Sequence, residues 1–93
     1  MKIKDVKASR AKNVDVIGRI TKKVDVPRYS IRLAKATLED ETGSIILNLW
    51  RDQVDQCHVG DVVKVRKAFV RLYKGVPELN TWEDIEVIKR KDR

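Results

Sequence analysis

Three aromatic residues lie among cations in the segment AFVRLYKGVPELNTW, which runs from residue 68 to residue 82. The rings belong to Phe69, Tyr73 and Trp82, and the cations between them are Arg71 and Lys74. Aromatic residues make up only 5% of the chain, and a small domain normally buries such rings because each covers a large apolar area. Exposed rings can instead stack on the bases of a single strand while neighbouring cations bind its phosphates. This spacing therefore predicts a surface that binds nucleic acid.

The net charge favours the same kind of partner. Lys and Arg number 21 against 14 Asp and Glu, which gives a formal net charge of +7 over 93 residues. Such an excess favours a polyanion, and nucleic acid is favoured over a membrane because the sequence has neither an amphipathic basic helix nor a long apolar run. From the charge alone, an alternative stays open in which the excess cations only keep the protein soluble.

Few residues offer catalysis or metal binding. Cys57 and His58 are the single cysteine and the single histidine, so no second pair completes a tetrahedral zinc site. The sequence has no Gly-rich phosphate loop and no Ser-His-Asp order. We therefore expect a protein that is not an enzyme and that has neither a metal nor another cofactor. The lone cysteine and the lack of an apolar signal segment predict a cytoplasmic, nucleoid-associated protein.

Alternating apolar and polar residues predict that β-strands position these side chains. Residues 13–26 predict a long strand bent by a bulge at Gly18. Residues 33–50 predict a hairpin around the turn DETG, with the apolar residues of both strands facing the core. The opposite face of its second strand carries Asn48 and Trp50, so Trp50 should point away from the core.

The next segments predict a short helix and two further strands. Residues 51–61 lose the alternation and predict a helix that ends at Gly60, with Val54 or Cys57 plugging the end of a barrel. Residues 61–73 resume as a strand, in which a one-residue bulge near Lys67 avoids burying charged side chains. The bulge sends one set of residues inward, Ala68, Val70 and Leu72, and the other set outward, Phe69, Arg71 and Tyr73. Residues 78–88 predict the last strand.

Five strands with a short helix between the third and the fourth are the order of an OB-fold, an all-β Greek-key barrel. We expect residues 1–93 to form a single OB-fold domain, with the barrel over about residues 12–88, a short basic N-terminal segment and a charged C-terminal tail. Periodicity alone leaves an SH3-like barrel as a rival.

The segments LEDETGSIILNLW and VGDVVKVRKAFVRLYKGVPELN resemble the OB domains of archaeal single-stranded DNA-binding proteins and of archaeal replication protein A. In that family an acidic-Thr-Gly turn precedes a strand ending in Leu-x-Leu-Trp, and a later strand leads to aromatic-Lys-Gly and Leu-Asn. The resemblance implies an OB-fold that binds single-stranded DNA. It also implies that Trp50, Phe69 and Tyr73 occupy positions where the family stacks bases, although close relatives often have Trp at the position of Phe69.

The predicted site joins these rings to residues that could contact phosphates or bases. The candidate phosphate contacts are Lys22, Lys23, Arg28, Arg32, Lys35, Arg71 and Lys74. Asn48 lies on the same strand face as Trp50, and Trp82 could be either a contact or a core residue.

We expect non-catalytic binding of single-stranded DNA in replication, recombination or repair, with other replication or repair proteins as further partners. Two alternatives stay open: an OB module whose rings dock another protein, and an OB domain that binds RNA or tRNA. Binding to a nucleic acid should weaken steeply with salt, whereas an aromatic protein interface should not.

Overall fold

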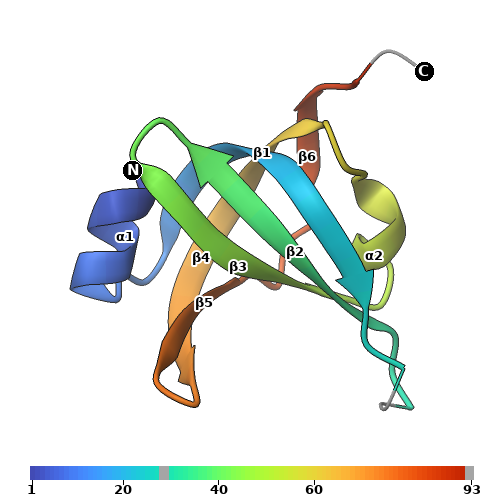
Figure 1. Ribbon diagram of the computed structural model, residues 1–93, viewed down its shortest axis with the longest axis horizontal. Coiled ribbons are helices and arrows are strands. Elements are labelled where there is room, and N and C mark those ends of the chain that lie inside the picture. The colour runs from blue at the N-terminus through green and yellow to red at the C-terminus, as the bar shows by residue number, and fades with distance from the viewer. Residues whose placement is uncertain (28–29, 92–93) are drawn as a thin grey trace.

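The computed structural model describes residues 1–27 and 30–91, and in it a twisted sheet closes into a barrel (Figure 1). The strands are β1 (Val14–Asp25), β2 (Leu33–Asp40), β3 (Gly43–Trp50), β4 (Val62–Tyr73), β5 (Val76–Asn80) and β6 (Glu86–Lys89), and the helices are α1 (Ile3–Ser9) and α2 (Gln53–Gln56). The strand order is β1-β2-β3-β5-β4-β6, and pairing of β1 with β4 closes the ring. β3 and β5 run parallel, while the other pairs are antiparallel. This arrangement confirms the predicted OB-fold class.

The predicted last strand, residues 78–88, is divided into β5 and β6. Side-chain amides of α2 form hydrogen bonds with backbone groups of the segment between the two strands. Nε2 of Gln53 donates to the carbonyl oxygen of Thr81 at 2.9 Å, and the N–H of Ile85 donates to Oε1 of Gln56 at 2.7 Å. These bonds replace the ladder that a continuous strand would make, so the described residues form six strands where five were predicted.

β1 changes register, but not at the predicted position. Val16, Gly18 and Ile20 keep one alternation toward the interior, and the pairing of β1 with β2 shifts between Ile20 and Lys22. The bulge predicted at Gly18 is therefore wrong. Gly18 is instead needed for close packing, because a Cβ at this position would lie 2.9 Å from Cγ of Leu38.

β4 carries the predicted bulge near Lys67. Val65 pairs with Val16, whereas Ala68 pairs with Val14, so β4 has an extra residue between these pairs. Lys67 lies in this stretch with a φ of 50°. The extra residue reverses the alternation of the strand, which lets the apolar side chains before and after it face the same core.

The hairpin of β4 and β5 projects beyond the core (Figure 1). Val70 packs partly buried against the core, but residues 71–76 are all exposed. Leu72 is 46% exposed, so the prediction that it points inward is wrong. Lys74 and Gly75, with φ of 51° and 81°, form the two-residue turn, and positive φ at both central residues is typical of a type I′ turn.

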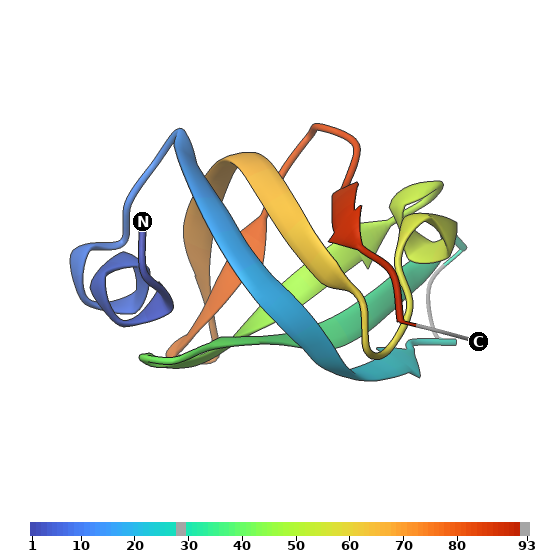
Figure 2. The ribbon, with the colours of Figure 1, turned by 90° about the horizontal axis from the view of Figure 1, so that it is seen from above.

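The two helices cover opposite ends of the barrel (Figure 2). α1 contributes Ile3 and Val6, both fully buried, where the sequence predicted only a basic segment. α2 is shorter than predicted, because the chain becomes extended at Cys57, and Gly60 lies in the following turn rather than at the helix end. Val54 and Cys57 are both buried at this end, as predicted.

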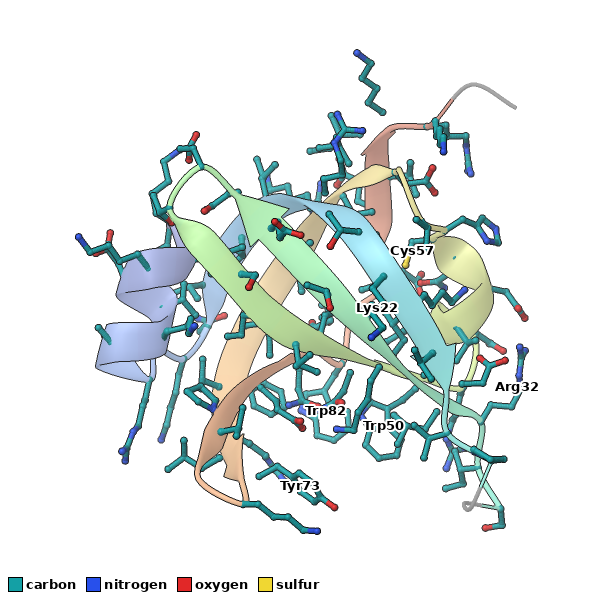
Figure 3. The ribbon with its side chains drawn as sticks, viewed as in Figure 1. Lys22, Arg32, Trp50, Cys57, Tyr73 and Trp82 are labelled. Carbon is teal, nitrogen blue, oxygen red and sulfur yellow. The ribbon has the colours of Figure 1, made fainter. Side chains whose placement is uncertain are left out.

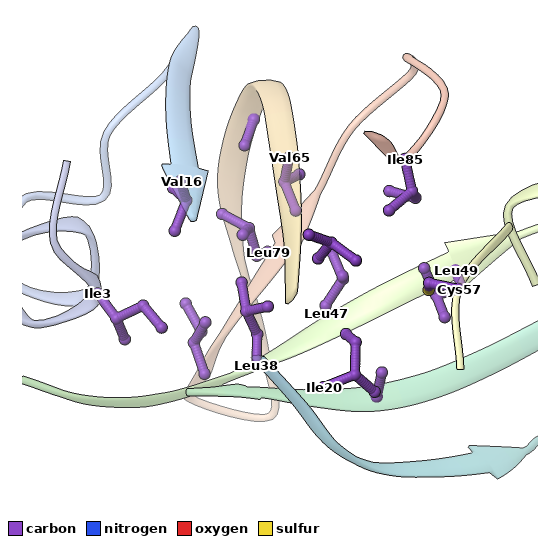
Figure 4. Packing of buried hydrophobic residues seen from close by; sticks show 14 of the residues in the cluster. Ile3, Val16, Ile20, Leu38, Leu47, Leu49, Cys57, Val65, Leu79 and Ile85 are labelled. Carbon is purple, nitrogen blue, oxygen red and sulfur yellow. The ribbon is translucent and has the colours of Figure 1, made fainter. Parts of the chain in front are cut away.

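The core fills the barrel from Ile3 at the end covered by α1 to Cys57 at the end covered by α2 (Figure 4). Its members on β2 and β3 are the residues predicted to face inward: Ala34, Ala36, Leu38, Ile45, Leu47 and Leu49. Because side chains alternate along a strand, the other residues of β2 and β3 are presented on the outer face of the sheet.

Candidate nucleic-acid interface

A groove crosses the outer face of β2, β3 and β5, between the segment that precedes β2 and the hairpin of β4 and β5. It has a volume of about 490 Å³, which is in the range of ligand-binding sites. It is lined by Ile31, Leu33, Lys35, Asn48, Trp50, Arg51, Phe69, Arg71, Leu72, Tyr73, Glu78, Asn80, Thr81 and Trp82. The rings and several of the polar residues predicted for the site therefore meet here.

Trp50 lies half-buried at the end of β3, on the outer face where its strand parity predicted it. Its indole Nε1 donates a hydrogen bond to Oδ1 of Asn80 at 3.2 Å. Its backbone N–H donates to Oε1 of Gln53 at 3.0 Å, which ties the end of β3 to α2. These bonds hold the ring in the groove while leaving part of it exposed.

A polar network forms the floor of the groove. Nζ of Lys35 donates to both carboxylate oxygens of Glu78, at 2.9 and 2.8 Å, and to Oδ1 of Asn48 at 3.1 Å. Nδ2 of Asn48 donates to Oε1 of Glu78 at 2.9 Å and to Oδ1 of Asn80 at 3.3 Å. The charge of Lys35 is therefore balanced by the buried carboxylate of Glu78. The network holds the side chains of the groove floor in place, and the ammonium of Lys35 is not available as a free cation.

Phe69 and Trp82 form a ridge at one side of the groove. Their ring centroids are 5.7 Å apart and the planes are tilted by 36°, a geometry of attractive aromatic contact. The guanidinium of Arg71 lies 5.3 Å from the centroid of Phe69. Trp82, for which the sequence allowed either a core or a contact position, is 80% exposed and so does not belong to the core.

Tyr73 and Lys74 lie at the tip of the hairpin. The ring of Tyr73 is 46% exposed, with Nζ of Lys35 at 4.9 Å and Nζ of Lys74 at 5.5 Å from its centroid. Figure 3 shows Trp50, Trp82 and Tyr73 gathered on the same side of the molecule. The rings of Phe69 and Tyr73 thus each have a cationic group nearby, although Lys74 itself does not line the groove.

Other predicted phosphate contacts do not line the groove. Arg32 makes a bidentate ion pair with Asp55, at 2.5 and 3.0 Å, and these hydrogen bonds lower the pKa of Asp55. Nζ of Lys23 donates to the carbonyl oxygens of Val54 and Cys57, so it anchors α2. Lys22 is exposed on β1 and is not among the lining residues (Figure 3). The predicted contact Arg28 lies outside the described residues.

The groove also contains residues that sequence analysis did not assign to the site. Arg51 follows Trp50 with a φ of 54°, and its side chain joins the lining. Asn80, which orients Trp50, belongs to the Leu-Asn element that carried the family resemblance. The position of Asn80 in that element could have assigned it to the site from the sequence. Nothing in the sequence distinguished Arg51 from other surface cations.

Cys57, which precedes His58 in the sequence, is buried with a free thiol. Burial raises the pKa of the Cys57 thiol to about 11, which suppresses the reactive thiolate at neutral pH. Across residues 1–27 and 30–91, no group of three or more His, Cys, Asp or Glu side chains could hold a metal ion. In the same part of the chain, no helix has the length and apolar character needed to cross a membrane.

Comparison with known proteins agrees with this geometry. A family model described as "Single-stranded DNA binding protein Ssb-like, OB fold" matches residues 2–87. An OB domain from Thermoplasma acidophilum has a TM-score of 0.78 and 24% identity, over 100% of this chain and 90% of that chain. The second OB-fold domain of replication protein A from Methanococcus maripaludis has a TM-score of 0.61 and 22% identity, over 88% of this chain and 91% of that chain. These structural likenesses support the fold, and the family match shows that the chain belongs to the Ssb-like family of OB-fold single-stranded DNA-binding proteins.

Proposed function

We propose that this protein binds single-stranded DNA in the groove without catalysing a reaction, and that it protects or organises single strands in replication, recombination or repair. One observation carries the proposal: Trp50, Phe69 and Tyr73 line the same groove as Arg71, with Lys74 beside Tyr73. Rings supply stacking platforms for any base, and cations beside them bind the phosphates.

The groove floor supports binding with little sequence preference. The donors of Lys35 and Asn48 and the acceptors of Glu78 are already used within the network. A base entering the groove therefore meets aromatic faces more readily than unpaired polar atoms that could read its edge. The phosphates are left to cations at the rim, for which Arg51, Arg71 and Lys74 are the candidates.

The family match supports nucleic-acid binding in general, since its description names single-stranded DNA binding. We further propose that other replication or repair proteins act beside this chain, and that it works at exposed single strands of the nucleoid.

The direct test is a comparison of ligands by fluorescence anisotropy. Fluorescein-labelled oligo-dT, a DNA duplex of the same length and oligo-U are each titrated with the protein. We expect oligo-dT to bind clearly more tightly than the duplex, because a duplex hides the base faces that the rings require. Equal affinity for the duplex would reject the stacking mechanism. Tighter binding of oligo-U would make RNA the ligand.

A protein-docking function is the second candidate, and exposed apolar side chains on both sides of the groove favour it. Ile31 and Leu72, which both line the groove, are 39% and 46% exposed. If the groove docks a protein, its affinity for DNA should be weak, whereas DNA binding by the proposed mechanism should be strong and should fall steeply as salt increases.

A further inference from the structure

A second basic pocket lies behind the ridge of Phe69 and Trp82. It has a volume of about 590 Å³, and its lining includes Lys12 and Lys67 together with Phe69, Arg71 and Trp82. The last three residues also line the groove, so the two hollows share one wall. We call this hollow the Lys12–Lys67 pocket.

The fold builds this pocket from three separate segments of the sequence, residues 12–13, 67–71 and 82–83. The N–H of Val70 donates to the carbonyl oxygen of Ala11 at 3.2 Å, which fixes the segment between α1 and β1 against β4. The N–H of Lys67 donates to Oδ1 of Asp15 at 3.1 Å, so the bulge of β4 is held by β1. Bulges commonly redirect a side chain beside a functional site, and this one brings Lys67 to the same hollow as Lys12.

The charges of the pocket suit a phosphate. Lys12, Lys67 and Arg71 are exposed, and among the described residues of the lining only Glu83 is acidic. Within the described part of the chain, the side chains of Lys12 and Lys67 take part in none of the ion pairs or hydrogen bonds. They differ in this from Lys35 and Arg32, whose charges are met by carboxylates of the protein. A bound anion would therefore interact more favourably with the unpaired ammonium groups of Lys12 and Lys67 than with cations that already have a carboxylate partner.

We propose that the Lys12–Lys67 pocket is a second subsite for the same DNA strand, binding the sugar-phosphate backbone of nucleotides that follow those stacked in the groove. The strand crosses the ridge of Phe69 and Trp82, and Arg71 contacts it between the two hollows. This inference rests on the proposed binding of single-stranded DNA, and it adds a path for the strand beyond the groove and two phosphate contacts.

The test compares a short and a long ligand. Fluorescein-labelled oligo-dT of about 4 and about 12 nucleotides are chosen to fill the groove alone and to reach past the ridge, within the range of site sizes for OB-folds. The variant is Lys12→Gln with Lys67→Asn, because asparagine tolerates the positive φ of position 67. The control variant, Lys89→Gln with Arg90→Gln, removes two exposed cations that line neither hollow. Thermal unfolding checks that both variants are folded, and Lys12→Gln alone provides a variant that leaves the bulge intact.

The readout is the slope of log affinity against log salt, because a longer ligand also gains affinity from having more binding registers. We expect the pocket variant to make the slope for the long ligand shallower by up to roughly 0.7 for each phosphate that is no longer neutralised, and to leave the short ligand unchanged. Lys12→Gln alone should give about half of this change, and the control variant none.

Two results would overturn the inference, and they are distinguishable from failure of the proposed function. If the pocket variant binds both ligands with the wild-type slope, or weakens equally on both, the pocket is not a separate subsite, while binding in the groove stands. If the wild-type protein binds neither ligand, the proposed function itself fails and the subsite falls with it.

Discussion

Trp50 and Asn80 are joined by a hydrogen bond from the indole Nε1 to Oδ1, 3.2 Å long, across the parallel strands β3 and β5. The same oxygen of Asn80 accepts a bond from Asn48 at 3.3 Å. The orientation of the ring is thus set by the sheet before any ligand arrives. A ring held in its binding position loses less conformational freedom on binding, so its contact contributes more to affinity.

Replacement of Trp50 by alanine should weaken DNA binding while leaving most of the stability. The stacking that this change removes is worth about 1–3 kcal/mol. Leu47→Ala is the matched change on the inward face of β3, where Leu47 is fully buried, and it should lower the free energy of unfolding by about 2–5 kcal/mol through the cavity it leaves. Oligo-dT affinity and thermal unfolding are measured for both variants. If Trp50→Ala unfolds as readily as Leu47→Ala, the ring supports the core rather than the ligand.

The sequence predicted the parts of the fold that depend on local alternation. The inward faces of β2 and β3 follow from their period of two, and they are confirmed. The bulge near Lys67 could be predicted because an unbroken alternation would have buried charged side chains, and the register confirms it. The resemblance to single-stranded DNA-binding OB domains is also confirmed by the family match.

The missed features depend on partners that are distant in the sequence. α1 has 7 residues and no capping side chain at Lys2, so nothing local predicts it. Its first N–H groups are instead met from the β2–β3 turn, by Asp40 and Thr42, which are 37 and 38 positions away from Ile3 and Lys4. The salt bridge of Lys35 also depends on a distant partner, because Glu78 is 43 positions away in the sequence. A cation is free or paired according to tertiary contacts, which periodicity cannot show.

The ridge of Phe69 and Trp82 should behave as a unit. Phe69→Ala and Trp82→Ala should each weaken oligo-dT binding by about 1–3 kcal/mol, and Trp82→Ala should barely change stability because its side chain is 80% exposed. Since each ring supports the other at 5.7 Å, the double variant should lose less than the sum, with a coupling of about 0.5–1.5 kcal/mol. A double-mutant cycle by anisotropy measures this coupling. Strict additivity would mean that the rings contact the ligand independently.

Arg71 and Lys74 should differ from Lys35 in their response to salt. Replacing both Arg71 and Lys74 by alanine should make the slope of log affinity against log salt shallower by roughly 0.7 for each phosphate that loses its cation. Lys35→Met combined with Glu78→Gln removes both charges of the pair and should leave the slope unchanged, because Glu78 already balances Lys35 at 2.8 Å. Lys35→Met alone should lower the thermal stability, since Glu78, a residue that is only 6% exposed, loses its cation. A slope that responds to the paired change would place a phosphate on the groove floor.

Asp40 should make the attachment of α1 dependent on pH. Its Oδ2 accepts the N–H of Ile3 at 2.9 Å, and its Oδ1 accepts the N–H and the hydroxyl of Thr42 at 2.7 and 2.6 Å. Partial burial acts to raise the pKa of Asp40, but together the hydrogen bonds from Thr42, Ile3 and Gly43 outweigh it and lower the pKa below the ordinary 3.8. A carboxylate with a lowered pKa stabilises the fold above its unfolded pKa, and this stabilisation is lost as the pH falls through the folded pKa.

Asp40→Ala should therefore lower the free energy of unfolding at neutral pH by about 1.5–3 kcal/mol, the range for hydrogen bonds to a charged group. Glu41→Ala is the control in the same turn, because its ion pair with Lys2 is exposed and solvent-screened and so adds little stability. Urea unfolding at neutral pH and at about pH 3 measures both effects, and the difference between wild type and Asp40→Ala should shrink in acid as the wild-type carboxylate protonates. Amide exchange at Ile3 gives the local readout, since its N–H loses its acceptor in the variant and should exchange faster. If the exchange rate of Ile3 does not change, α1 is held by its buried apolar face alone, and the capping carboxylate contributes nothing to its attachment.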